Sequence, residues 1–455
     1  MTPRIRKIAV IGGGPSGLTM LKALRGEQAF DTIKCFERGS QTGGLWNYSE
    51  EASRATIPST DPHRAPLGWE SAMYKYLDGN IVRETQTWNE FPLDDKEAPL
   101  FMDRSQILNY VKEYGRSVEP MITFNTEVTK LGSRKEGGWD LEYKNLETGY
   151  RGKEEFDAVA VTTGNYNLPY VPDYPGLTEF DKEHPDVIIH SKTYRKPEDY
   201  SCKKLLIVGG SVSAYDLANQ IGDFAAEMHQ SIRSGEPSDI LRHKKTVFHS
   251  ELSRFNHENC GVTFKDGSRI VNLDAIIFAT GYLKSYPFLD ETINKSENPI
   301  ITDGRRLRNI YKHIFYRPDP SLVFLATPRF IAPFQVAEAQ AAYVAKIWSN
   351  RRNLPAKNEQ KMWELARVKS HGNGTGFDSL PYPENVDYTK FLEDEVNQAI
   401  QAPNSTKPKH IDDRVYAIRR NTAPLKIASN KYFHKHGVKP RRIQQLIDDG
   451  LFEWE

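Results

Sequence analysis

Two stretches of the chain share one pattern of hydrophobic and polar positions. In the first, the apolar run KIAVI at 7–11 is followed by a glycine-rich turn and by residues that suit a helix. A second short apolar run, TIKCF at 32–36, comes after that helix. Strand, turn, helix and strand in this order predict a βαβ unit of a parallel sheet.

The glycines of this turn have the spacing of a dinucleotide-binding motif. Gly12, Gly14 and Gly17 fit G-x-G-x-x-G, in which the first permits the tight turn, the second admits a pyrophosphate and the third lets helix and strand pack closely. The helix N-terminus supplies N–H donors and a positive partial charge. Glu37, 20 residues beyond Gly17, can accept hydrogen bonds from ribose hydroxyls and would repel a 2′-phosphate. This turn is therefore predicted to bind FAD or NAD, and not NADP.

The second stretch repeats the pattern from Lys204. After the apolar run, Gly209, Ser211 and Ala214 stand at the G-x-G-x-x-A positions, and a helix-compatible run follows. Arg233 lies 24 residues past Gly209, in the position that corresponds to the acidic residue of the first unit. A guanidinium there can hold a 2′-phosphate in a bidentate manner, which predicts NADP(H).

Two further strands lead to a prediction of the domain organisation. FDAVAVTTG at 156–164 and LDAIIFATGY at 273–282 each read as a buried strand that ends in a small-residue turn, where a parallel sheet faces its ligand. A proline-marked linker at 169–175 follows the first of them. We expect an α/β fold with two Rossmann-like dinucleotide-binding domains, the smaller inserted into the larger. The predicted domains are an FAD-binding domain at 1–167 and 284–455 and an NADPH-binding domain at 168–283.

Other segments give weaker signals. Gly43 and Gly44 permit a close backbone approach, and Trp46 beside them could cover a flat ring or simply pack in a turn. Asp78, Gly79 and Asn80 read as a turn. The remaining expectations are an irregular loop at 50–70, a helix capped by Asp103 at 103–118, short strands at 121–145, a strand at 323–326, a helix at 337–348 with Gln340 in its first turns, and a polar, partly helical chain beyond 350.

Composition narrows the class of protein. The 455 residues carry 61 basic and 60 acidic side chains, so nothing indicates an electrostatic nucleic-acid binder. Only Cys35, Cys202 and Cys260 occur and none forms C-x-x-C, which argues against a flavin disulfide reductase and favours a reduced intracellular protein. The first strand begins within a few residues of the N-terminus, and no run of 18 apolar residues occurs. We expect a soluble, cytoplasmic protein without a signal peptide or transmembrane anchor.

Together these residues resemble the flavin-containing monooxygenases, which are class B flavoprotein monooxygenases, and most closely the soluble fungal members. The shared motifs are GGGPSG at 12–17, G-G-x-W at 43–46, M-Y-x-x-L at 73–77, IVGGSVSA at 207–214 and ATGY at 279–282. The family fingerprint F-x-G-x-x-x-H-x-x-x-Y/F-K/R is present only in its second half. His190, Tyr194 and Arg195 match it, whereas His184 and Asp186 stand at its Phe and Gly positions.

The resemblance implies a mechanism. FAD is held by the larger domain and NADPH by the inserted one; NADPH reduces the flavin, and O2 then forms a hydroperoxide at flavin carbon 4a. Bound NADP+ shields this species until a soft nitrogen or sulfur nucleophile of a small amine, thiol or sulfide takes the distal oxygen. Asn80 is the implied catalytic residue beside the flavin, and Ile81 follows it where fungal relatives often have Thr.

The resemblance also implies cofactor contacts. On the FAD side these are Gly12, Gly13, Gly14, Pro15, Ser16, Gly17, Glu37, Gly44, Leu45, Trp46, Met73, Asn80, Ile81, Glu127, Val128, Thr163, Gly164 and Gln340. On the NADPH side they are Gly209, Ser211, Val212, Ser213, Ala214, Arg233, Ser234, Thr280, Gly281 and Tyr282. No metal is expected.

Three alternatives remain open at this stage. A Baeyer–Villiger monooxygenase would oxygenate ketones. An NADPH oxidase or flavin reductase would pass electrons without inserting oxygen, and a flavoprotein scaffold or redox-sensing module would have no turnover. The expected partners are O2 and a small soft-nucleophile substrate without nucleic acid, and the sequence leaves a homodimer open.

Overall fold

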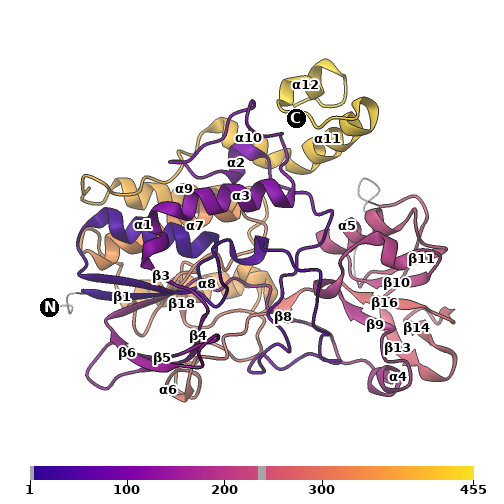
Figure 1. The fold of residues 1–455 in the computed structure, drawn as a ribbon, viewed down its shortest axis with the longest axis horizontal. Coiled ribbons are helices and arrows are strands. Elements are labelled where there is room, and N and C mark those ends of the chain that lie inside the picture. The colour runs from indigo at the N-terminus through magenta and orange to yellow at the C-terminus, as the bar shows by residue number, and fades with distance from the viewer. Residues whose placement is uncertain (1–4, 234–241, 455) are drawn as a thin grey trace. The chain divides into compact units, whose positions relative to one another are not determined.

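The computed structural model describes residues 5–233 and 242–454, and the chain divides into two compact units (Figure 1). Unit 1 comprises Met1–Trp46, Asp78–Gly164 and Tyr286–Glu455. Unit 2 comprises Asn47–Leu77 and Asn165–Ser285. Each unit contains one of the two glycine-rich turns, so each is described by itself.

Unit 1 is built on a seven-stranded sheet. Its order is β18 (Ile310–Tyr311), β19 (Phe315–Tyr316), β20 (Leu322–Phe324), β7 (Ala158–Val161), β1 (Lys7–Ile11), β2 (Thr32–Phe36) and β3 (Ile122–Thr123). β1 lies between β2 and β7 and is parallel to both, and β20 is parallel to β7. The βαβ unit and the strands expected within 156–164 and 323–326 are therefore confirmed.

The two faces of this sheet are covered by different elements, and β1 shows how the sequence specifies this. Successive side chains of a strand point to opposite faces. Ile8 and Val10 pack in the core formed with the helices α1 (Pro15–Glu27) and α7 (Pro333–Trp348). Ala9 and Ile11 pack in a second core with an antiparallel sheet of β4 (Thr126–Ser133), β5 (Trp139–Asn145) and β6 (Arg151–Phe156). An uninterrupted apolar strand is what a sheet covered on both faces requires.

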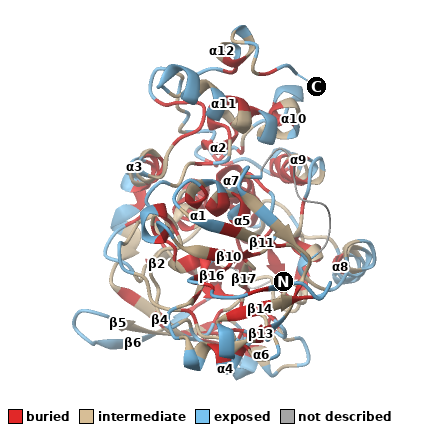
Figure 2. Ribbon diagram, turned by 90° about the vertical axis from the view of Figure 1, so that its right-hand side faces the viewer, coloured by how far each residue is buried: buried red, intermediate tan, exposed pale blue. Residues whose placement is uncertain are grey.

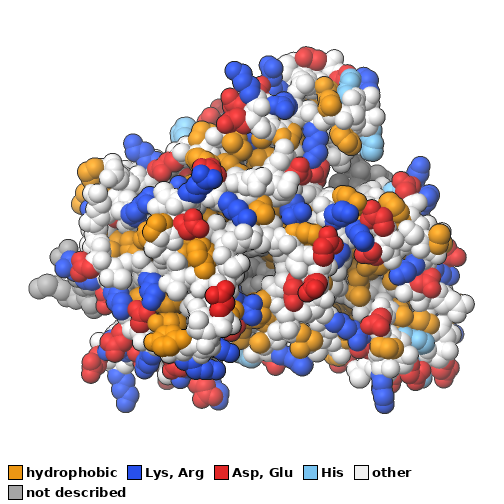
Figure 3. All heavy atoms as spheres, viewed as in Figure 1, with side chains coloured by type: hydrophobic (Ala, Val, Ile, Leu, Met, Phe, Trp, Pro, Cys, Tyr) orange, Lys and Arg blue, Asp and Glu red, His pale blue; other side chains and the backbone are white. Residues whose placement is uncertain are grey.

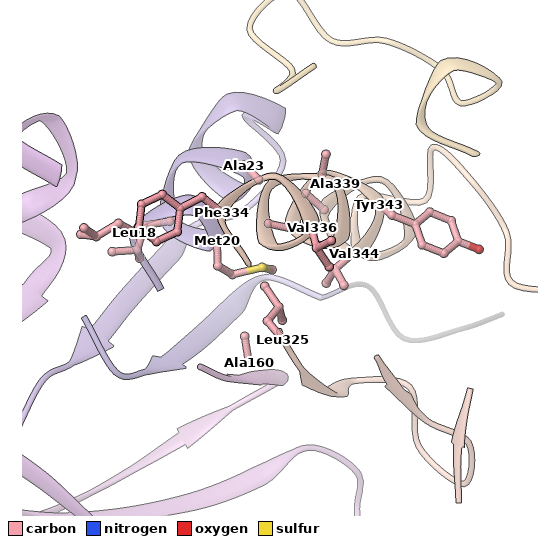
Figure 4. Packing of buried hydrophobic residues seen from close by; sticks show 14 of the residues in the cluster. Leu18, Met20, Ala23, Ala160, Leu325, Phe334, Val336, Ala339, Tyr343 and Val344 are labelled. Carbon is pink, nitrogen blue, oxygen red and sulfur yellow. The ribbon is translucent and has the colours of Figure 1, made fainter. Parts of the chain in front are cut away.

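Helices α1 and α7 pack closely against each other above the sheet (Figure 4). Leu18 and Met20 of α1 meet Phe334 and Val336 of α7 in one buried cluster. Helix α7 is almost wholly buried, as Figure 2 shows, and its small side chains allow close approach because interaxial distance depends on the side chains at the contact. The buried alanines of α7 are Ala337, Ala339, Ala341, Ala342 and Ala345.

The rest of unit 1 is helical. The helix expected at 103–118 is α3 (Arg104–Gly115), which begins with a capping box between Asp103 and Gln106. The other helices are α2 (Arg83–Gln86), α6 (Glu291–Asn294), α8 (Lys357–His371), α9 (Glu384–Asn397), α10 (Asp413–Arg420), α11 (Thr422–His436) and α12 (Ile443–Asp448). Buried side chains from α10, α11 and α12 share a cluster with Val82, Leu100 and Phe101.

Unit 2 is built on a five-stranded parallel sheet in the order β12 (Thr246–His249), β11 (Glu227–Ser231), β10 (Lys204–Val208), β16 (Ala275–Phe278) and β9 (Ile188–His190). Helix α5 (Val212–Ile221) follows β10, as the sequence pattern predicts. The smaller elements are α4 (Leu177–Glu183), the sheet of β13 (Leu252–Asn256), β14 (Gly261–Phe264) and β15 (Arg269–Ile270), and the pair β8 (Leu168–Pro169) and β17 (Tyr282–Leu283).

The segment Asn47–Leu77 belongs to unit 2, whereas the sequence-based boundaries placed it in the first domain. Ser59 forms a β-bridge with Val171, and the Tyr74 hydroxyl donates a hydrogen bond to Asp216 of α5. These partners lie more than 100 residues further along the chain, so local sequence carries no sign of them. Which unit holds which cofactor stays a prediction.

Helix α7 also begins earlier than expected. Pro333 occupies its first turn, where backbone N–H groups have no partner within the helix, so the missing N–H of proline costs nothing and its fixed φ suits the helix. Gln340 therefore lies in the middle of α7 and not in its first turns.

Glu338 of α7 is wholly buried, and burial raises the pKa of its carboxyl to about 8 from an ordinary value of 4.5. Between these pH values the unfolded chain has lost the proton and the folded chain keeps it. The free energy of unfolding therefore falls as pH rises, by up to about 1.4 kcal/mol per pH unit. We expect Glu338→Gln, which cannot ionise, to gain thermal stability over the parent progressively from pH 5 to pH 8.

The measurement is the difference in Tm between variant and parent at several pH values. Glu136→Gln, at an exposed position, is the matched control and should show no such trend. A Tm difference for Glu338→Gln that is independent of pH would show that the carboxyl is ionised in the folded protein.

Candidate dinucleotide-binding sites

The first glycine-rich turn lies at the carboxyl end of β1, and two of its glycines are required by the fold itself. Gly12 has φ of +105°, in the left-handed region that side chains rarely adopt. A Cβ at Gly17 would lie 1.9 Å from the Gly12 carbonyl oxygen. The third glycine thus brings helix α1 against the strand end, as the motif predicts.

The N-terminus of α1 is open to an anion. Its N-cap is Gly14, which has no side chain to accept from the first N–H groups, and Pro15 follows. Helix α3, by contrast, begins with a full capping box. Gly14 faces Gly44, since a Cβ built on Gly44 would lie 2.8 Å from the Gly14 Cα. A pyrophosphate would suit this helix N-terminus, because uncapped N–H donors and the helix dipole both favour negative charge.

Glu37 lies beside the turn, directly after β2. Its Oε2 accepts a hydrogen bond from the Gly13 N–H and its Oε1 accepts one from the Gly39 N–H, both at 2.5 Å. The carboxylate is thereby fixed at the end of the strand where the ribose was predicted. Glu127 lies close by, because its Oε1 is 3.2 Å from Nε of Arg38, and Val128 of the same strand is buried in the core.

The other residues proposed for the FAD side lie at several places. Thr163 and Gly164 follow β7, and Leu45 lies in the 3₁₀ turn Gly44–Trp46. The Trp46 ring meets the Phe334 ring edge-to-face at 6.3 Å between centroids, which supports the packed-Trp interpretation. Met73 lies in unit 2, and its carbonyl accepts from Arg195.

The amide of Gln340 is already used by the protein. Its Oε1 accepts from the Ala326 N–H at 2.7 Å, and its Nε2 donates to the Tyr388 hydroxyl at 2.8 Å. The side chain is fully buried, so it acts in this structure as a brace between helix α7, the end of β20 and helix α9. A contact of Gln340 with FAD stays a prediction.

Thr162 is a residue that the sequence reasoning missed. Its hydroxyl lies 2.8 Å from the carbonyl oxygens of both Ile11 and Gly12 and joins the end of β7 to the first turn. Thr162 belongs to the run Thr-Thr-Gly at the end of the strand, of which only Thr163 and Gly164 were predicted to contact FAD.

Asn80 is exposed in unit 1, and contacts of the two residues before it hold the loop in place. The Gly79 N–H donates to the Met102 carbonyl at 2.9 Å. The Asp78 carboxylate forms ion pairs with Lys426 at 3.3 Å and with Lys439 at 2.7 Å, two lysines from the C-terminal region. The next residue, Ile81, is half-buried.

The second glycine-rich turn, in unit 2, repeats the geometry of the first. Gly209 has φ of +148°, and a Cβ there would lie 2.5 Å from the Ala279 carbonyl oxygen. Ser211 is the N-cap of α5, but its hydroxyl makes no capping hydrogen bond. Val212 and Ser213 in the first turn are exposed, while Ala214 is buried against the sheet. The helix N-terminus is again available to a phosphate.

Arg233 follows β11 by two residues and is exposed. Because β11 is parallel to β10, the two strands end at the same edge of the sheet, with Ser231 paired to Val208. Arg233 therefore lies at the edge where the second turn begins. Ser234, which was predicted with it, lies outside the described residues.

His190, the histidine of the fingerprint, forms a hydrogen bond with the backbone of the ATGY motif at 279–282. Burial lowers the pKa of His190 to about 3, so the ring is neutral near pH 7. Its Nδ1 accepts from the Lys192 N–H at 3.1 Å, which leaves the proton on Nε2 to be donated to the Gly281 carbonyl at 2.9 Å. Thr280 donates to the Tyr170 carbonyl, and the Tyr282 ring contacts the His190 ring edge-to-face.

Arg195, the last fingerprint residue, fastens the segment Asn47–Leu77 within unit 2. Its guanidinium is buried and donates to the carbonyls of Glu51 at 2.9 Å, Ser71 at 3.2 Å and Met73 at 3.4 Å. Tyr194 is also fully buried and donates to Gln220 of α5 at 3.1 Å. This half of the fingerprint is therefore part of the internal frame of unit 2.

Among the described residues, no helix is long and apolar enough to cross a bilayer, and no group of three or more His, Cys, Asp or Glu is arranged to hold a metal ion. Positive and negative side chains are interspersed on the face shown in Figure 3. Two uncapped helix N-termini after glycine turns, each at the carboxyl ends of parallel strands, are typical of α/β proteins that bind two dinucleotides.

Comparison with known proteins identifies the family. The model of the flavin-binding monooxygenase-like family matches residues 5–242 and 236–419. The chain is 28% identical over 445 residues to the thiol-specific monooxygenase of Saccharomyces cerevisiae, covering 95% of this chain and 94% of the relative. It is 31% identical over 405 residues to flavin-containing monooxygenase FMO GS-OX-like 3 of Arabidopsis thaliana, covering 85% of each.

Comparison with solved structures agrees with this family. It is similar to S-allyl-L-cysteine S-oxygenase from Allium sativum with a TM-score of 0.79 and 26% identity, over 98% of this chain and 97% of that chain. The chain belongs to the flavin-binding monooxygenase-like family. The predicted enzyme class, a flavin-containing monooxygenase with FAD and NADPH as cofactors, is confirmed at the level of the family.

If Arg233 reads the 2′-phosphate, its removal must distinguish the two nicotinamide cofactors. We expect Arg233→Ala to raise KM for NADPH by about tenfold, because a charge-assisted hydrogen bond to the 2′-phosphate is lost. KM for NADH, which has no 2′-phosphate, should change little. Steady-state kinetics with both cofactors measures this. Arg254→Ala, at another exposed arginine of unit 2, is the matched control. Equal effects of Arg233→Ala on both cofactors would refute the assignment.

Proposed function

We propose that this protein is an NADPH- and O2-dependent monooxygenase that oxygenates soft nitrogen or sulfur atoms of small molecules. The observation that carries the proposal is the pair of open glycine turns, one beside Glu37 and the other at the sheet edge of Arg233. The names of two similar proteins, a thiol-specific monooxygenase and an S-oxygenase, favour sulfur substrates.

Unit 1 has the groups that an FAD nucleotide requires. The uncapped N-terminus of α1 would bind the pyrophosphate, and Glu37 would accept hydrogen bonds from the ribose hydroxyls. When bound, the flavin supplies the redox chemistry that activates O2 and delivers one oxygen atom. The residues of the chain bind it, orient it and control access of water.

Asn80 is the side chain of this chain that we propose acts beside the flavin. Its amide can both donate and accept a hydrogen bond, and it is exposed without a hydrogen-bond partner among the described residues. The ion pairs of Asp78 with Lys426 and Lys439 hold the loop two residues before it. A fixed loop and an unused amide are what a positioning contact to a cofactor needs.

Unit 2 would hold NADPH. The first turn of α5, with Val212 and Ser213 exposed, would bind the pyrophosphate, and Arg233 the 2′-phosphate. His190 and Arg195 would support this site from within unit 2, because both ring nitrogens of His190 and the Nη1 and Nη2 of Arg195 form hydrogen bonds with its backbone.

Asn80→Ala tests the catalytic role. We expect FAD to stay bound, product formed per NADPH to fall several-fold and H2O2 to rise by a matching amount, because the contact that steadies the oxygenating state is lost. Flavin absorbance, product and peroxide are measured together. Asn397→Ala, on the exposed face of α9, is the control. A normal product yield would leave Asn80 as a turn residue only.

The substrate class is tested with a thiol, a tertiary amine and a cyclic ketone under NADPH and air. We expect S- or N-oxygenated product, one per NADPH consumed. Lactone from the ketone with no heteroatom product would indicate a Baeyer–Villiger enzyme. Stoichiometric H2O2 with every compound would indicate an oxidase.

A further inference from the structure

A cavity of about 220 Å³ in unit 1 is lined by residues of α2 and of the C-terminal region. Figure 1 shows these helices. Its wall combines guanidinium groups with an apolar side. The lining residues are Arg83, Glu84, Arg414, Arg442, Ile443, Gln444, Ile447 and Trp454. None of them belongs to the predicted cofactor contacts.

Arg83 is the unusual group in this wall. The residue is 5% exposed, and Nη1 donates to the carbonyls of Ala98 and Arg441. Its Nε is buried without a hydrogen-bond partner, and no carboxylate among the described residues forms an ion pair with its guanidinium. Burial lowers the pKa of Arg83, and the nearby carboxylates of Glu84, Asp95 and Asp94 only partly offset this effect. The cost of the buried, unpartnered Nε is therefore not met by a direct ion pair.

The other two arginines of the wall already have carboxylate partners. Arg414 donates to both oxygens of Glu84 at 2.8 and 2.9 Å, and Arg442 lies 2.6 Å from Asp95. The lining itself contains three arginines, Arg83, Arg414 and Arg442, and one carboxylate, Glu84. An anion that entered the cavity would meet an excess of guanidinium groups in the lining and would supply an acceptor for the Arg83 Nε.

We propose that this cavity binds a small organic anion, with a carboxylate or phosphate turned to the arginines and a flat apolar body against Ile443, Ile447 and Trp454. The guanidinium fork matches the geometry of either oxyanion, and an indole suits an aromatic body. The volume is below the roughly 300–1,000 Å³ of sites for drug-sized ligands, so a single-ring compound fits and a dinucleotide does not.

The cavity lining and the loop of Asn80 are linked through the chain and through packing. Arg83 begins α2 three residues after Asn80, and Val82 between them is buried in one cluster with Ile443 and Leu446 of α12. A ligand bound between α2 and α12 would therefore contact the chain segment that directly follows Asn80.

The test is calorimetric titration of the FAD-loaded full-length protein with saturating NADP+, which keeps the probes out of the nicotinamide-nucleotide site. Benzoate, inorganic phosphate and benzyl alcohol separate the contributions of charge and ring. We expect benzoate to bind with a stoichiometry of one, phosphate to bind more weakly, and benzyl alcohol not to bind. Absence of benzoate binding, or equal binding of benzyl alcohol, would overturn the proposal.

Variants then locate the site. Arg83→Met should weaken benzoate binding by about tenfold or more. Arg442→Gln is a second variant that should fold, because that side chain is 71% exposed, and it should weaken benzoate binding several-fold. Lys435→Gln, at an exposed lysine of α11 outside the cavity, is the control and should bind as the parent does.

Trp454→Phe gives an independent readout. Benzoate should change the tryptophan fluorescence of the parent, and most of this change should disappear in the variant. Unchanged benzoate affinity in Arg442→Gln, together with an unchanged fluorescence response in Trp454→Phe, would exclude the cavity as the site.

Discussion

The contact of Gly17 with the Gly12 carbonyl is the constraint on which the first site depends. The space there is too small for a single methyl group, so helix α1 approaches the end of β1 as closely as two backbones can. This contact directs the helix N-terminus at the carboxyl edge of the sheet, where donors and dipole converge. Unit 2 does not repeat this contact, because Ala214 stands at the corresponding position and carries a methyl group. Its turn repeats the contact of the first glycine instead: a Cβ on Gly209 would lie 2.5 Å from the Ala279 carbonyl oxygen, as a Cβ on Gly12 would lie 3.0 Å from the Thr162 carbonyl oxygen.

The parts of the fold that local pattern dictates could be predicted from the sequence. β1 and β2 have the expected bounds, because a buried parallel strand reads as an apolar run and the glycine turn marks its end. The place of the segment Asn47–Leu77 could not be predicted, because Arg195 and Asp216 hold it from far along the chain. Arg83 was missed for the same reason: its burial depends on helices that come some 330 residues later.

The candidate sites show a similar division. The turns, Glu37 and Arg233 could be proposed from the sequence because their spacing from a glycine motif is fixed by βαβ geometry, and their contacts with cofactors stay predictions. The resemblance suggested Gln340 and Met73 as FAD contacts. In the structure the Gln340 amide forms hydrogen bonds within the protein, and Met73 lies in unit 2. The fingerprint residues His190 and Arg195 are polar and yet serve the backbone, which shows that a recognisable motif can mark internal support as well as chemistry.

The ion pairs between Asp78 and the lysines Lys426 and Lys439 have a consequence for the order of folding. The first glycine turn is synthesised early, yet helix α7, which packs against α1, begins at residue 333. The lysines that hold the loop of Asp78 come about 100 residues after that. Long-range contacts of this kind form late. An amino-terminal fragment that contains the whole first βαβ motif would therefore still expose the apolar face that α7 buries.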